Sequence, residues 1–102
     1  MINNEFRLIG VATSNLKLVQ HKNVKTYSIS VEVERPQKKD TYELTVYFYD
    51  FNRLVDFSFD FKGKTVVVGG YIAHFSQRIT TLVGTNIIVI NKDGVGLEEF
   101  NS

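Results

Sequence analysis

The feature that most restricts the fold of this chain is an alternation of apolar and polar residues at period two. Between residues 26 and 34, the apolar residues Tyr27, Ile29, Val31 and Val33 alternate with serines and glutamates. Successive side chains of a β-strand point to opposite faces, so this pattern predicts a strand with one buried and one exposed face. Stretches rich in β-branched and aromatic residues predict further strands at 6–12, 42–49 and 65–75, and a last strand around 80–83 and 86–90.

The connections between these strands indicate a small barrel. Asp50 is expected to cap a short helix that carries Phe51 and Leu54 on one side, although the stretch 57–61 that follows alternates like a strand. Five strands with one short helix between the third and the fourth predict an all-β, five-stranded Greek-key barrel of the oligonucleotide-binding kind, the OB-fold. We expect one domain over residues 1–92 and a short, poorly ordered tail over 93–102.

The residue types argue against an enzyme. The chain has no cysteine, which removes disulfides, thiol catalysis and thiolate metal sites. His21 and His74 lack metal-ligand spacing, the carboxylates are scattered, and no glycine run is followed by the Lys-Ser/Thr of a phosphate-binding loop. We therefore expect no catalytic residue, no metal, no cofactor and no small-molecule substrate.

The N-terminus has no basic region followed by a long apolar run, and no stretch approaches the roughly 18 apolar residues that a membrane helix needs. We therefore expect a cytoplasmic protein without a membrane partner.

Charge is distributed unevenly, although the net charge is only +1. Residues 1–40 hold seven Lys/Arg against four acidic residues, whereas residues 41–102 hold five against seven. The basic half could line a groove for nucleic acid, or it could be an ordinary solvated surface.

The aromatic residues are the less ordinary feature, with five tyrosines and eight phenylalanines but no tryptophan. Alternation along 42–49 puts Tyr42 and Phe48 on one face of a strand and Tyr47 and Tyr49 on the other. One of these faces must lie outside a small barrel. Exposed aromatic rings beside basic residues can stack nucleobases, but they could equally pack in a subunit interface.

Four motifs follow one another along residues 1–90: Met1-Ile2-Asn3 with Leu8-Ile9-Gly10, the stretch 27–36 ending in Arg35-Pro36, the stretch 40–48, and the stretch 62–72 with its paired glycines. In this order and spacing they resemble the bacterial single-stranded DNA-binding protein family. The resemblance implies sequence-independent binding of single-stranded DNA in replication, recombination or repair, by a homo-oligomer that is a dimer or a tetramer.

The resemblance also implies site residues. Tyr42 and Phe48 stand where the family has the stacking aromatics of its third strand, Phe75 lies near the aromatic of its fourth strand, and Arg35 closes the second strand as an arginine of the family does. The remaining candidates are expected phosphate contacts, chosen for their charge and loop position: Lys17, Lys22, Lys25 and Arg78.

Three departures from the family pattern narrow the expected role. Gln37 stands where some members of the family have a further stacking tryptophan, and Glu5 and Leu44 stand at positions that are often basic. The stretch 96–102 lacks the acidic tip that recruits partner proteins in the family. A short chain of this kind is also similar to the primosomal replication protein B family. The alternative function is therefore such a protein, or a protein–protein adaptor whose aromatics lie in the oligomer interface.

Overall fold

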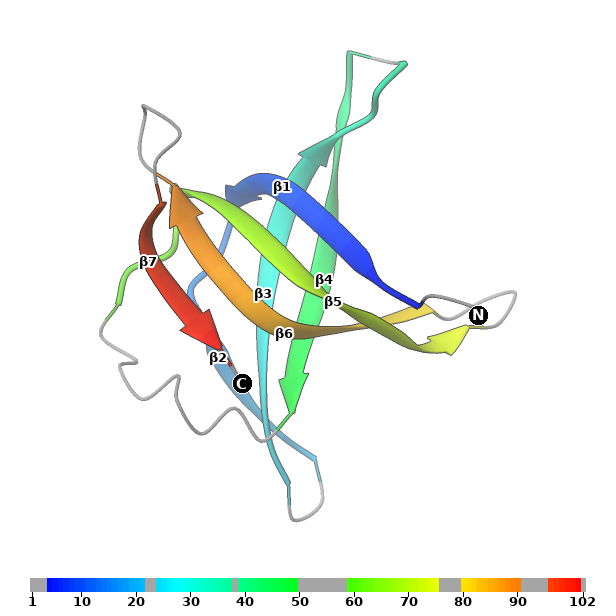
Figure 1. Cartoon of the computed structure of the whole chain (residues 1–102), viewed down its shortest axis with the longest axis vertical. Coiled ribbons are helices and arrows are strands. Elements are labelled where there is room, and N and C mark those ends of the chain that lie inside the picture. Colours follow the sequence, from blue (N-terminus) through cyan, green and yellow to red (C-terminus); the bar gives the residue numbers. More distant parts are fainter. Residues whose placement is uncertain are drawn as a thin grey trace.

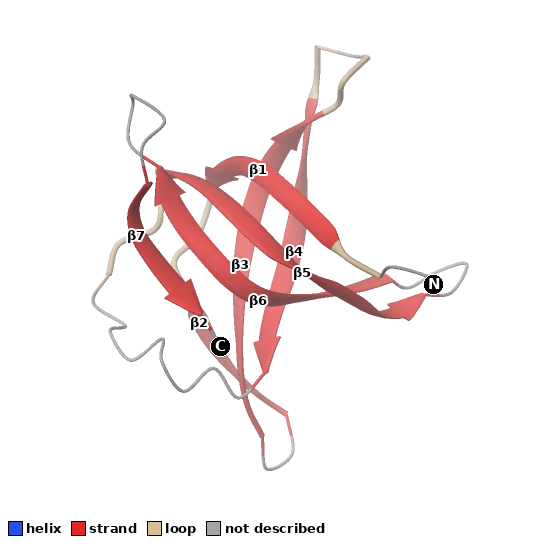
Figure 2. Cartoon of the chain, viewed as in Figure 1, coloured by secondary structure: helices blue, strands red, loops and turns tan. Residues whose placement is uncertain are grey.

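In the computed structural model, β-strands dominate the described residues, which are 4–21, 24–37, 39–49, 59–75, 80–90 and 96–101 (Figure 1). The strands are β1 (Phe6–Ala12), β2 (Lys17–His21), β3 (Val24–Glu34), β4 (Thr41–Tyr49), β5 (Thr65–Phe75), β6 (Thr80–Ile90) and β7 (Gly96–Asn101). These ranges contain no helix, and therefore no helix that is long and apolar enough to cross a membrane (Figure 2).

Five of the strands form a closed circuit. β1 pairs with β5, β5 with β6, and β3 with β4, all antiparallel, while β6 and β4 pair in parallel. The pairs Val11–Glu32 and Ala12–Val31 join β1 to β3 and complete the circle. β2 is added to β3, and β7 is added to β6. The predicted five-strand barrel is therefore confirmed, with two more strands at its margins.

The side chains of β3 that fill the barrel interior are the alternating apolar residues of the sequence pattern. Ile29 and Val31 are fully buried, and Tyr27 and Val33 are 7% exposed. They pack with side chains of the other strands in one cluster, whose further members include Val46, Phe48, Val66, Val68, Ile87 and Val89. The strand pattern therefore identifies the core face of β3 correctly.

The paired glycines of β5 mark a bulge. The register between β5 and β6 shifts between Gly69 and Gly70. A Cβ on Gly70 would lie 1.8 Å from the carbonyl oxygen of Val83, so no larger residue fits there without moving the backbone. The bulge lets the β5–β6 pair bend around the barrel.

Two strands were not expected, and one expectation is not tested. β2 was not predicted, and it forms a hairpin with the start of β3. The stretch 96–101 is strand β7, so the expectation of a poorly ordered tail is wrong for these residues. The short helix expected after Asp50 falls on residues 50–58, which lie outside the described part of the chain.

Candidate nucleic-acid interface

Phe48 belongs to the core and not to the surface. Its exposed fraction is 0%, and its ring lies against Gly84 on β6. The register of β3 and β4 pairs Phe48 with the buried Tyr27. A ring enclosed in this way offers no face to a nucleobase, so the structure does not support the stacking role that the resemblance implies for Phe48.

The outer face of β4 carries the residues that alternate with the buried Val46 and Phe48. Tyr49 is 42% exposed and Tyr47 is half-buried. The sequence correctly predicts that these two tyrosines share a face, and the structure shows that this face lies outside the barrel. Neighbouring residues of a strand lie on opposite faces, so the outward Tyr47 and Tyr49 stand on either side of the buried Phe48.

A third tyrosine joins this face from β5. Val83 on β6 pairs with Tyr47 on one side and with Tyr71 on the other, so the three side chains lie in one row across the sheet. Val83 is 3% exposed although it is not part of the core cluster, which is consistent with cover from its two neighbours. Tyr71 is 41% exposed. With strands about 4.8 Å apart, the backbones of Tyr47 and Tyr71 are separated by roughly 10 Å.

On its other side the row continues onto the β2–β3 hairpin. Tyr47 pairs with Ser28, and Ser28 pairs with Lys17, whose side chain is exposed. We call the row Lys17–Ser28–Tyr47–Val83–Tyr71 the tyrosine row. A neighbouring row places Val19 and Tyr49 on either side of the buried Thr26. Aromatic rings and a lysine thus occur together on one convex surface.

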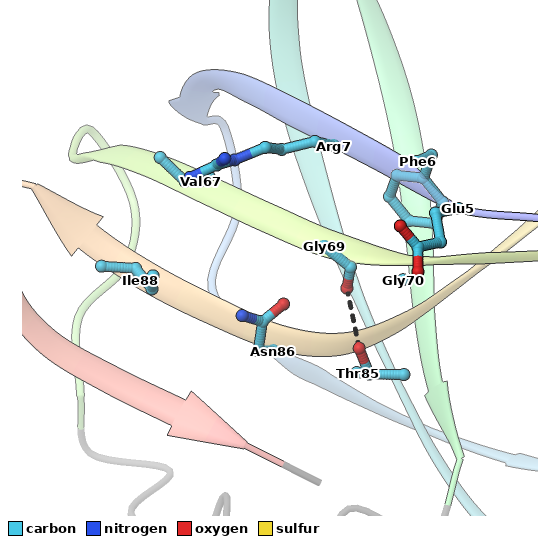
Figure 3. Close-up of a pocket in the computed structure, with 9 residues that line it drawn as sticks. All are labelled: Glu5, Phe6, Arg7, Val67, Gly69, Gly70, Thr85, Asn86 and Ile88. Carbon is cyan, nitrogen blue, oxygen red and sulfur yellow. Dashed lines mark hydrogen bonds between the residues drawn. The ribbon is translucent and has the colours of Figure 1, made fainter. Parts of the chain in front are cut away.

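Beside the tyrosine row the outer surface has a shallow hollow of about 460 Å³ (Figure 3). Gly69 forms its floor, and Arg7 and Asn86 come from the strands on either side. The Thr85 hydroxyl donates to the Gly69 carbonyl over 3.4 Å. Glu5 also lines the hollow, but Arg7 is exposed and makes no salt bridge within the described residues, so its guanidinium is available to an anion such as a phosphate.

Tyr42 and Arg35 form a separate cluster at the far end of the β3–β4 hairpin. The Arg35 guanidinium lies over the Tyr42 ring, 5.3 Å from its centroid, and its Nε is 3.7 Å from a carboxylate oxygen of Asp40. The backbone N–H of Arg35 also donates to the Asp40 carbonyl. Tyr42 is 40% exposed, so of the two stacking aromatics expected on the third strand it alone has an accessible ring.

The remaining predicted residues are dispersed. Lys25 is exposed on β3, near the hairpin turn, and has the parity of Tyr27 rather than that of the tyrosine row. Phe75 ends β5, where it pairs with Thr80. Lys22 and Arg78 lie outside the described residues. Sequence reasoning missed Tyr71 and Arg7 as interface candidates, because nothing local in the sequence links them to Tyr47.

No group of three metal-ligating side chains occurs in the described ranges. The chemistry that these residues offer is stacking and ion pairing.

Comparison with solved structures shows the same fold. The N-terminal domain of the PriB protein from Thermoanaerobacter tencongensis, whose structure is dimeric, aligns over 89% of this chain and 100% of its own, with 19% identity and a TM-score of 0.64. A mitochondrial single-stranded DNA-binding protein from S. cerevisiae aligns over 89% of this chain and 97% of its own, with 15% identity and a TM-score of 0.75. The SSB domain of a Synechococcus protein aligns over 85% and 96%, with 13% identity and a TM-score of 0.67.

No protein-family model and no curated protein matches the sequence. The resemblance seen in the sequence motifs is therefore confirmed at the level of the fold, since these structures are single-stranded DNA-binding and PriB barrels.

Proposed function

We propose that this chain binds single-stranded DNA without sequence preference and acts in replication, recombination or repair as a binding protein rather than an enzyme. The observation that carries the proposal is the tyrosine row, in which two outward tyrosines and an exposed lysine lie in register across five strands. Every base has a π-face, so rings presented in this way bind bases of any sequence. Lys17 and Arg7 would contact phosphates on either side.

Stacking supplies more of the proposed affinity than charge does. The net charge is +1, and the tyrosine row holds one lysine. Each stacked base contributes about 1–3 kcal/mol, whereas phosphate contacts weaken as salt rises. We therefore expect a salt dependence weaker than that of a strongly basic protein.

The proposed assembly is a homo-oligomer formed through β1. Residues 6–10 pair with β5 on one edge, and their other edge has no strand partner within the described residues. Ile9 is 62% exposed beside this edge and Val11 is 43% exposed. An unpaired edge with apolar side chains is the kind of surface that a second strand covers. The tyrosines of β4 would then remain available to DNA.

Fluorescence anisotropy of a labelled oligo-dT at two salt concentrations tests the proposal. We expect binding at micromolar protein in low salt and a change in tyrosine fluorescence, because the bases would cover Tyr47 and Tyr71. The adaptor alternative, in which the tyrosines lie in a protein interface, predicts that oligo-dT leaves tyrosine fluorescence unchanged. Absence of binding in low salt would refute the proposal.

A further inference from the structure

The two faces of the β3–β4 hairpin differ in charge where the hairpin extends beyond the barrel (Figure 1). Its outer face, which carries Tyr49 and Tyr47 near the barrel, continues toward the tip with Thr45, Glu43 and Thr41 on β4. The facing residues of β3 are Ser30, Glu32 and Glu34. All three glutamates are exposed, so this face changes from aromatic to acidic along its length.

The acidic stretch is unfavourable for a phosphate chain. Glu32 and Glu43 are direct cross-strand partners, an arrangement in which two like charges repel one another. The Thr13 hydroxyl donates to Oε2 of Glu43 over 2.9 Å, which holds this carboxylate on the outer face. No lysine or arginine of the described residues forms a salt bridge with either glutamate. A DNA strand that follows the outer face past Thr45 would therefore bring its phosphates against unneutralised carboxylates.

The opposite face of the hairpin tip has the reverse character. Tyr42 pairs with Val33 and lies on the same face of β4 as the core residues. It is nevertheless 40% exposed, because it lies near the end of the barrel. Arg35 lies over its ring and also pairs with the Asp40 carboxylate, while Lys39 is exposed in the turn that joins the two strands. Two cations against one carboxylate leave a positive charge beside an accessible ring, which can hold one nucleotide with its base stacked and its phosphate neutralised.

The edge of β4 connects the two faces. β4 pairs with β6 only at Val46 and Tyr47, so residues 41–45 have no strand partner on that edge within the described part of the chain. Nothing among the described strands separates the outer face at Thr45 from the opposite face at Tyr42 along this edge.

We infer that a single strand longer than the tyrosine row leaves the outer face at the acidic stretch, crosses the free edge of β4, and stacks a base at Tyr42 beside Arg35. This inference rests on the proposed function. The family resemblance already implies contacts at Tyr42 and Arg35, and the inference adds the path that joins this second subsite to the tyrosine row and the carboxylates that set it. The glutamates act as a barrier that sets where the strand turns, and Tyr42 receives the nucleotide that follows the turn.

The test compares two oligo-dT lengths, about 5 and about 16 nucleotides, near the two ends of the range of site sizes known for one such barrel. Tyr42→Ala should weaken binding of the long oligonucleotide about tenfold and leave the short one unchanged within about twofold, whereas Tyr42→Phe should bind both like the wild type. Because Tyr42 is exposed, both variants should melt at the wild-type temperature, which circular dichroism checks.

A second arm tests the barrier. The double substitution Glu32→Gln and Glu43→Gln should tighten binding of the long oligonucleotide, and in this background Tyr42→Ala should cost less than it does in the wild type. A Tyr42→Ala effect of equal size on both lengths, or on neither, would overturn the second subsite. An unchanged cost of Tyr42→Ala in the glutamine background would overturn the barrier. Failure of the wild type to bind the short oligonucleotide would instead refute the proposed function itself.

Discussion

The ring of Phe48 occupies the space that a side chain at position 84 would need. A Cβ on Gly84 would lie 2.3 Å from Cε1 and 2.5 Å from Cζ of Phe48, closer than such atoms approach in proteins. The glycine of β6 thereby admits the Phe48 ring to the core, where it is fully buried. The two residues fix how β4 lies beside β6, and with it the position of Tyr47 one residue earlier.

Gly84→Ala should lower the free energy of unfolding by about 1–3 kcal/mol, because the added methyl group must displace the Phe48 ring from a packed core. Urea unfolding followed by circular dichroism measures this loss. Phe48→Leu makes room for the methyl group, so the double variant should lose less than the sum of the two single losses. Strict additivity would contradict the contact.

Tyr47→Ala and Tyr71→Ala should each weaken oligo-dT binding by about 1–3 kcal/mol, since each removes one stacking surface. Anisotropy titrations at one fixed salt concentration measure the change. Tyr71→Phe is the matched control, because it keeps the ring and loses only the hydroxyl group. Binding of both alanine variants at wild-type strength would show that bases do not stack on the tyrosine row.

Lys17→Ala should reduce the slope of the logarithm of the binding constant against the logarithm of salt concentration by about 0.7, the value for one phosphate contact on a single strand. Arg7→Ala should have a similar effect if the hollow beside Gly69 takes a phosphate. Lys62→Ala is the control, because Lys62 is an exposed lysine in the turn before β5 and lies outside the tyrosine row. An equal loss of slope in all three variants would indicate a diffuse effect of net charge.

Ile9→Asp should dissociate the proposed homo-oligomer, because it places a carboxylate on the apolar face beside the free edge of β1. Sedimentation equilibrium of the variant should give the mass of a single chain. Leu18→Asp serves for comparison, since Leu18 on β2 is exposed to a similar extent, 57% against 62%. Dissociation by Leu18→Asp alone would move the interface to the β2–β3 hairpin.

The sequence pattern predicts the strands of the barrel well, because alternation reports directly on which side chains share a face. It predicts that Tyr42 and Phe48 lie on one face of β4, and they do. It could not show which face is inside, since both faces of β4 carry aromatic residues. The cross-strand register decides this, because Phe48 pairs with Tyr27 from the apolar face of β3. Aligning β4 so that Phe48 faces the apolar residues of β3 would have identified Tyr47, which then faces Ser28, as the outward residue.

The two unpredicted strands lack this alternation. In β2 the adjacent residues Leu18 and Val19 point to opposite faces and are both exposed, so no polar residue marks the solvent side. In β7 two consecutive glutamates, Glu98 and Glu99, resemble a solvated tail, although they pair with Val89 and Ile88. Tyr71 was missed for a different reason: its relation to Tyr47 passes through Val83 and exists only in the folded sheet.

The pairing of β1 with β5 also constrains how the protein is made. Arg7 pairs with Gly69, about sixty residues later in the chain, so β1 leaves the ribosome long before its main partner. At roughly 5–20 residues per second, this interval lasts about 3–12 s. During that time Ile9 and the unpaired edge of β1 are exposed in the nascent chain. Efficient production in a cell therefore depends on protecting the first strand from aggregation until the fifth strand has been translated.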